Sequence, residues 1–145
     1  MIAWAILQPM VALMIWTMVM WVWMYATRIP ALSAAKVDPD SLVRDPAKSL
    51  DAILPPAVQW KAHNYNHLHE APTLFYAVCL VLAVTGNGGG HGTQVAWAYV
   101  ALRVVHSLVQ AIVNKVMLRF QIFTLSSLCL MALIARAAQV VFGFA

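Results

Sequence analysis

Polar side chains recur at helical spacing in two stretches of the chain that are otherwise apolar. The first is HNYNHLHE, residues 63–70, and the second is ALRVVHSLVQAIVN, residues 101–114. At about 100° of rotation per residue, each set falls on one face of a helix. The face of the first stretch carries His63, Asn66, His67 and Glu70. The face of the second stretch carries Arg103, His106, Gln110 and Asn114.

The first face could hold a divalent metal ion. His63 and His67 lie one helical turn apart, and Glu70 follows about one turn later. Imidazole and carboxylate groups at this spacing are suitable metal ligands. Only His106 could add a ligand from the second stretch, and arginine side chains nearby disfavour a cation. The metal site is therefore the weaker of two interpretations.

A peptide-like anion is the other interpretation, because it also uses the arginines. Guanidinium groups pair with carboxylates in a bidentate geometry, and Arg103 and Arg119 could do so. The side chains of Asn66 and Gln110 could meet the amide groups of such a ligand. These residues predict an anion-binding pocket.

The composition places these residues in a membrane protein. Hydrophobic residues make up 63% of the 145-residue chain and charged residues 10%, whereas about a quarter of a soluble domain is charged. The apolar residues form blocks of roughly 20, the length that a helix needs to cross a bilayer. The formal charge is +4, but no basic cluster with interleaved aromatic residues appears, which excludes nucleic-acid binding.

The pattern predicts an all-α fold, a single integral membrane domain with a four-helix transmembrane bundle. The predicted helices cover about 2–26, 57–84, 94–116 and 120–144, with a polar loop at 27–56. Within that loop, Asp45 followed by Pro46 predicts a short surface helix at 46–53. The glycines of TGNGGGHG, residues 85–92, end the second long helix. Neither the second nor the third helix shows a broken segment, which disfavours a channel or transporter.

Basic residues predict the orientation. They concentrate in the first loop and in the connection between the third and fourth helices: Arg28, Lys36, Arg44, Lys48, Lys61, Lys115 and Arg119. The positive-inside rule then places both loops in the cytoplasm and both termini outside. Short loops and the lack of a C-terminal targeting signal favour a bacterial inner membrane. Arg136, deep in the fourth helix, has no evident partner in the sequence.

Glu70 and Arg103 are predicted to form an ion pair. Both lie roughly 20 Å from the cytoplasmic ends of their helices. Each charge alone in hydrocarbon would cost several kcal/mol, so each must face the other, a partner subunit or water. Polar residues can also simply hold membrane helices together, at about 0.6 kcal/mol per hydrogen bond. Two or three contacts would suffice for packing, however, and the remaining polar groups favour a site.

These features together resemble a known family. Four spans, a long polar first loop, NHLHEAPTLFYAV at residues 66–78 and ALRVVHSLVQAIVNKVMLR at residues 101–119 resemble the MAPEG family, the membrane-associated proteins of eicosanoid and glutathione metabolism. The resemblance covers most of the chain. It implies a homotrimer that binds glutathione between adjacent subunits near the cytoplasmic side.

The resemblance also implies roles for individual residues. Arg103 would bind the carboxylates of glutathione, Glu70 would bind its amine, and Arg119 would activate its thiol. The implied activity is that of a glutathione transferase or peroxidase, acting on a lipophilic electrophile delivered from the lipid.

The chain departs from the family pattern at three positions. His63 stands where an arginine is expected. His67 stands at an asparagine position, with Asn66 one place earlier. Gln110 replaces a tyrosine. Because these changes remove a carboxylate partner and a thiol contact, the alternative function is a noncatalytic trimeric membrane protein that binds a lipid, another small anion or a partner protein.

Overall fold

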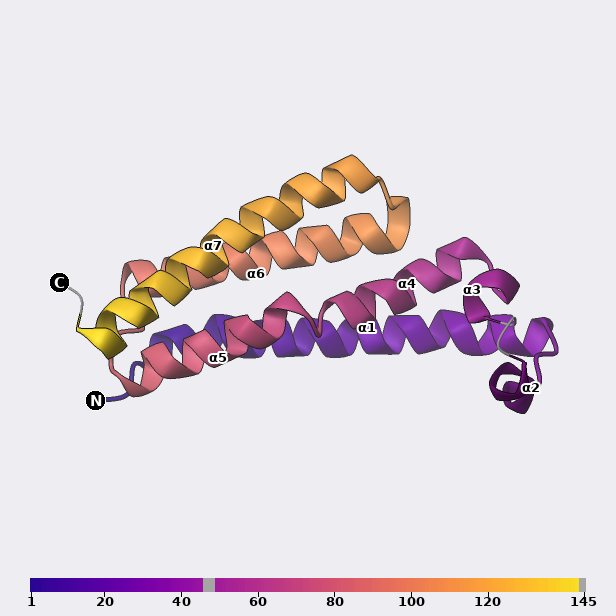
Figure 1. Ribbon diagram of the computed structural model, residues 1–145, viewed down its shortest axis with the longest axis horizontal. Helices are drawn as coiled ribbons and strands as arrows, with labels where there is room; N and C mark the ends of the chain where they lie inside the picture. The colour runs from indigo at the N-terminus through magenta and orange to yellow at the C-terminus, as the bar shows by residue number, and fades with distance from the viewer. Residues whose placement is uncertain (46–48, 144–145) are drawn as a thin grey trace.

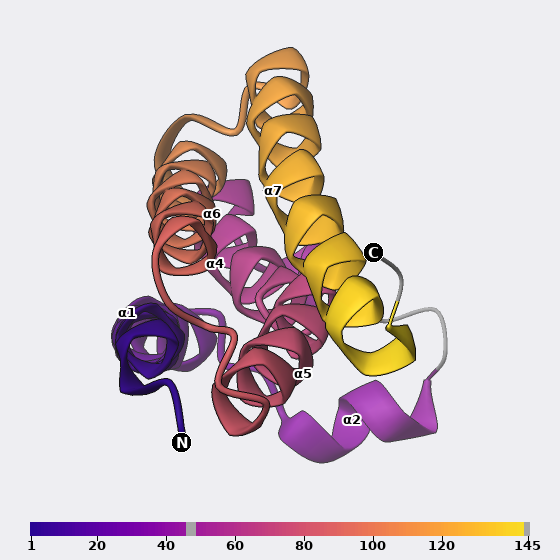
Figure 2. The ribbon, with the colours of Figure 1, turned by 90° about the vertical axis from the view of Figure 1, so that its left-hand side faces the viewer.

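Four long helical segments lie side by side in a computed structural model that describes residues 1–45 and 49–143 (Figures 1 and 2). The first segment is the short η1 (Trp4–Ile6) followed by α1 (Leu7–Ala34), and the second is α4 (Pro56–His67) with α5 (Ala71–Val84). The third is α6 (His91–Leu108) with the π-helix η2 (Val109–Val113), and the fourth is α7 (Val116–Phe142). Two short helices, α2 (Pro39–Arg44) and α3 (Leu50–Ile53), lie between α1 and α4.

All four segments are long and apolar enough to cross a membrane, which agrees with the four predicted spans. The N-terminus and the C-terminal end of α7 lie at one end of the bundle, and α2, α3 and the α6–α7 connection lie at the other (Figure 1). The interior contains Phe75 stacked on Tyr99, with ring centroids 4.4 Å apart. Outward-facing apolar side chains remain exposed, for example Ile15 at 60% and Met131 at 62%, as a lipid-facing surface requires.

Helix ends differ from the predicted ones in three places. Helix α1 continues through Pro30 to Ala34, so the predicted loop at 27–56 begins too early. The fourth helix, predicted to begin at about 120, begins earlier, because α7 starts at Val116 and already contains Arg119. The third span covers His91–Val113, a few residues earlier than predicted. The predicted end of the fourth helix at 144 lies outside the described residues.

The loop after α1 contains one helix that was predicted in part and one that was not. Of the predicted surface helix at 46–53, residues 46–48 lie outside the described part. The remainder forms α3, whose cap is Ser49: its hydroxyl accepts a hydrogen bond from the Ala52 amide at 3.2 Å. The additional helix α2 begins after Asp38, whose carboxylate accepts a hydrogen bond from the Asp40 amide at 3.1 Å.

The second span is broken, whereas the sequence predicted a continuous helix. Helix α4 ends at His67 and α5 begins at Ala71, with Glu70 in a non-helical conformation (φ −90°, ψ −101°). Pro72 explains the break, because proline has no amide hydrogen and its ring collides with the carbonyl four residues earlier. Thr73 stabilises the new helix start by donating its hydroxyl to the Glu70 carbonyl at 2.6 Å. The break also releases the carbonyl of His67 from the helical hydrogen-bond pattern.

Close packing between the turn after α5 and the start of the chain yields a first prediction. A Cβ atom added at Gly88 would lie 2.5 Å from Cγ2 of Ile6, which is fully buried. Gly88→Ala is expected to destabilise the protein by about 1–3 kcal/mol, the usual cost of overpacking. Gly89→Ala is the matched control, because a Cβ at Gly89 meets nothing within 4 Å. Thermal unfolding in detergent should separate the two variants, and equal melting temperatures would contradict this packing.

Candidate functional site

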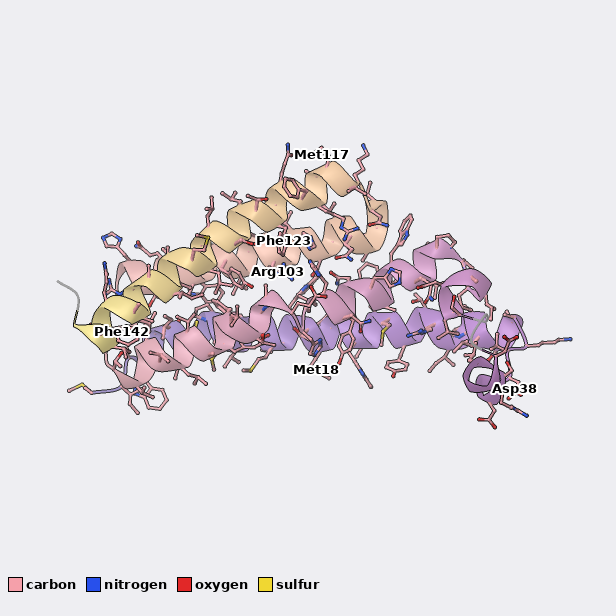
Figure 3. All side chains as sticks on the ribbon, viewed as in Figure 1. Met18, Asp38, Arg103, Met117, Phe123 and Phe142 are labelled. Carbon is pink, nitrogen blue, oxygen red and sulfur yellow. The ribbon has the colours of Figure 1, made fainter. Side chains whose placement is uncertain are left out.

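The break in the second span lies against α6, and Arg103 bridges the two. Its Nη2 donates to the carbonyl oxygen of His67 at 3.1 Å. Arg103 is only 1% exposed and lies between the two helix pairs near Phe123 (Figure 3). Its guanidinium carbon is 5.8 Å from the centre of the Phe123 ring, within the range of a cation–π contact. The His67 carbonyl, which the break removes from the helical hydrogen-bond pattern, thus receives a charged donor.

The Arg103 cation has no carboxylate beside it. Among the described residues, no ion pair joins Arg103 to an acid within 4 Å, and its Nε and Nη1 are buried without hydrogen-bond partners. The predicted Glu70–Arg103 ion pair is therefore not formed within the chain. Glu70 turns to His67 instead, with Oε2 2.7 Å from Nδ1, because the break carries its side chain outward, where it is 65% exposed.

A pocket of about 210 Å³ opens at the end of the bundle where α4, α6 and α7 meet. Its polar wall contains His67, His106 and Arg119, and its apolar wall contains Val116, Phe120 and Phe123. The rings of His67 and His106 lie 5.2 Å apart, and the ring of Phe123 lies 5.5 Å from that of His67. Arg103 lies behind this wall and does not line the pocket. The pocket therefore combines the half-buried guanidinium group of Arg119, two imidazole rings and an aromatic surface.

Arg119 is positioned by an unusual turn. The π-helix η2 ends at Asn114, which has a left-handed backbone (φ +53°), a conformation that asparagine tolerates better than most residues. The Asn114 amide donates to the Val109 carbonyl at 2.7 Å. Its side-chain oxygen accepts a hydrogen bond from Arg119 Nη1 at 2.5 Å. Asn114 thus ends one span and holds the arginine of the next.

His63 and Asn66 lie apart from this pocket. They line a second hollow of about 270 Å³ with Arg28, Leu50, Asp51, Gln59 and Ala62. There, one oxygen of Asp51 is 2.9 Å from His63 Nε2 and accepts a hydrogen bond from Gln59 Nε2 at 2.8 Å. The predicted polar face of the second span is therefore divided: His63 and Asn66 line this hollow, His67 lines the first pocket, and Glu70 lines neither.

The remaining predicted residue of the third span, Gln110, is buried in η2, and its Oε1 has no hydrogen-bond partner among the described residues. His106 is also buried, and its Nδ1 likewise has no partner there. Sequence reasoning did not single out Phe120 and Phe123 or the anchoring contact of Asn114. For the two phenylalanines, the only signal in the sequence was their position one or two turns into the last span, close to Arg119.

The metal interpretation receives no support from the geometry. Within residues 1–45 and 49–143, no three His, Cys, Asp or Glu side chains are grouped closely enough to hold one ion. His63 pairs with Asp51, whereas His67 pairs with Glu70. The three proposed ligands therefore belong to two separate contacts.

Comparison with known proteins agrees with the resemblance seen in the sequence. The family model of the MAPEG family matches residues 6–139, nearly the whole chain. Neither the curated proteins nor the solved structures gave a significant match. Together with the four apolar helices, the family match identifies an integral, multi-pass membrane protein. The chain therefore belongs to the MAPEG family.

Proposed function

We propose that this protein is a glutathione-dependent transferase or peroxidase that acts on lipophilic electrophiles. The observation that carries the proposal is the pocket of Arg119, His67 and His106, which has the buried, unpaired Arg103 cation behind its wall. Its positive charge suits the carboxylates of glutathione. Its aromatic and aliphatic wall suits a substrate that arrives from the lipid.

We further propose that a homotrimer completes the site. A volume of about 210 Å³ is below the usual range of about 300–1,000 Å³ for ligand pockets. Glu70, His63 and Asn66 are exposed on the protomer, although polar groups inside a membrane normally face protein or water. A neighbouring subunit against α4 would enlarge the pocket and cover these residues. In this arrangement the charged first loop and the α6–α7 connection lie on the cytoplasmic side of a bacterial inner membrane, with both termini outside.

Residues in and around the pocket have separate roles in the proposed reaction. Bound glutathione would supply the sulfur nucleophile that attacks an electrophilic carbon or a peroxide oxygen. Arg119 stabilises the thiolate with the guanidinium nitrogens that Asn114 does not use. Glu70 binds the amine of the ligand, and Arg103 attracts its carboxylates. Phe120 and Phe123 exclude water from the reacting atoms.

A noncatalytic trimer that binds a lipid, another small anion or a partner protein is the second candidate. It is favoured by Gln110, because a buried amide with an unpartnered oxygen replaces the tyrosine of the family pattern. Such a protein would keep the positive pocket without the thiol contact.

Thermal unfolding with and without glutathione distinguishes the two candidates. A ligand at one hundred times its dissociation constant stabilises a protein by about 2.7 kcal/mol. Glutathione and S-methylglutathione are both expected to raise the melting temperature, because binding depends on carboxylates rather than on the thiol. Only glutathione should then be consumed with a lipophilic electrophile. No shift at millimolar glutathione would reject the proposal, and a shift without turnover would favour the noncatalytic trimer.

A further inference from the structure

Arg136 lies at the opposite end of the bundle from the candidate site. It is on α7, six residues before Phe142, so it lies roughly 9 Å from the end of the helix. Its side chain is exposed, and its Nε donates to the carbonyl oxygen of Asn87 at 3.1 Å. This contact holds the Nε of the guanidinium group against the turn between α5 and α6 and leaves its two outer nitrogens without a hydrogen bond among the described residues.

Among the ion pairs of the described residues, none involves Arg136, and Glu70 pairs with His67. All five Asp and Glu residues of the chain lie between residues 38 and 70. Four of them precede α4, in the part of the chain that Figure 1 places far from the C-terminal end of α7. Because a guanidinium group within a membrane span needs an anion or water, the partner of Arg136 is water or an anion other than these side chains.

A pocket of about 280 Å³ surrounds this side chain, between the start of α6 and the end of α7. Its polar lining consists of His91, Arg136 and Gln139. Its apolar lining consists of Gly92, Val95, Ala132, Leu133 and Ala135. Gly92 lies directly beside the arginine, since a Cβ there would be 3.7 Å from Arg136 Nε. The pocket thus offers a cation and an amide above apolar walls, at the depth where arginines reach lipid headgroups.

We propose that this pocket binds the phosphate group of an anionic membrane lipid in the leaflet where both chain termini lie. Arg136 donates to the phosphate oxygens in a charge-assisted, bidentate geometry, and the Gln139 amide adds a neutral donor. Ala132 and Ala135, which are both exposed, contact the first methylene groups of the acyl chains. The apolar lining favours a lipid over free phosphate, which shares the same charged chemistry.

Melting temperatures of the purified full chain in detergent test this site. The probes are phosphatidylglycerol, phosphatidylcholine and inorganic phosphate. The variants are Arg136→Gln and, as matched control, Lys115→Gln, which removes one positive charge at the other end of the bundle. Phosphatidylglycerol is expected to raise the melting temperature of the wild type and of Lys115→Gln by about 4 °C or more. In Arg136→Gln the rise should fall by more than half.

Three results would overturn the proposal. One is an equal rise with Arg136→Gln, and another is an equal rise with phosphatidylcholine. The third is a rise with inorganic phosphate that phosphatidylglycerol does not increase further. If Arg136→Gln does not fold, Arg136→Lys and Ala132→Phe replace it: the first keeps the charge and should retain most of the rise, and the second fills the pocket and should remove it. Arg119→Gln should leave the rise unchanged, so this site is tested independently of glutathione.

Discussion

Replacing Arg103 with Met is expected to weaken glutathione binding at least about tenfold, while the melting temperature of the ligand-free protein changes little. The Glu70–Arg103 ion pair predicted from the sequence would instead make this change reduce the stability of the trimer, because Glu70 would lose its partner. Glu70 pairs with His67 instead, so Arg103→Met leaves no acid unpaired. The variant loses one hydrogen bond to the His67 carbonyl, a cost of about 1–3 kcal/mol. It also removes a buried cation whose desolvation costs several kcal/mol.

Loss of the Arg103 charge weakens the binding of glutathione even without direct contact, because charges act over longer distances in a dry interior than in water. Isothermal titration of glutathione and thermal unfolding without it measure the two effects separately. Arg103→Lys keeps the charge and should retain most of the affinity. Arg136→Met, at the other end of the bundle, should retain all of it. A sharp fall in the melting temperature of ligand-free Arg103→Met, with affinity intact, would instead make Arg103 a purely structural donor.

The four spans could be predicted from the sequence because each depends on one strong signal. Apolar blocks of bilayer length define the helices, and the glycines of residues 85–92 end the second span. The polar faces also predicted a site at one end of the bundle, and its location stays a prediction. His67, His106 and Arg119 meet in one pocket, as helical spacing and the family resemblance together indicated.

The break after His67 could not be placed as readily, since proline is often tolerated in membrane helices. Pro72 is visible in the sequence. Whether it bends the helix or ends it depends on which donors bond the carbonyl oxygens that lose their helical partners. Here Arg103 is one such donor. Once the helix ends, the assumption of one continuous polar face fails, and His63 and Glu70 no longer share a hollow with each other.

The turn at Asn114 was missed for a related reason. A π-helix cannot be recognised from hydrophobic periodicity, because the single widened turn at Val109–Val113 does not repeat. It only changes the face on which the following residues lie. Asn114 was read as one more polar residue on the face of Arg103. Its left-handed backbone instead directs it toward Arg119.

Replacing Arg119 with Gln is expected to lower kcat/KM for glutathione conjugation by about 100-fold to 1,000-fold. This is the usual loss when one donor to a developing or reacting anion is removed. The fall should appear mainly in kcat, because Arg119 acts on the sulfur and Arg103 attracts the carboxylates. Steady-state kinetics with glutathione and a lipophilic electrophile measure the split. Unchanged kcat in Arg119→Gln would show that the thiolate is stabilised elsewhere.

Asn114 allows the same mechanism to be tested without altering the charge. Asn114→Gly keeps the left-handed backbone at no steric cost but removes the oxygen that holds Arg119. Asn114→Ala removes the oxygen and also strains the turn by about 1–2 kcal/mol. Both variants are therefore expected to lose kcat by a similar factor of about ten, whereas only Asn114→Ala should melt at a clearly lower temperature. Full activity in Asn114→Gly would mean that Asn114 shapes the turn alone, since the arginine would then hold its position without the side-chain contact.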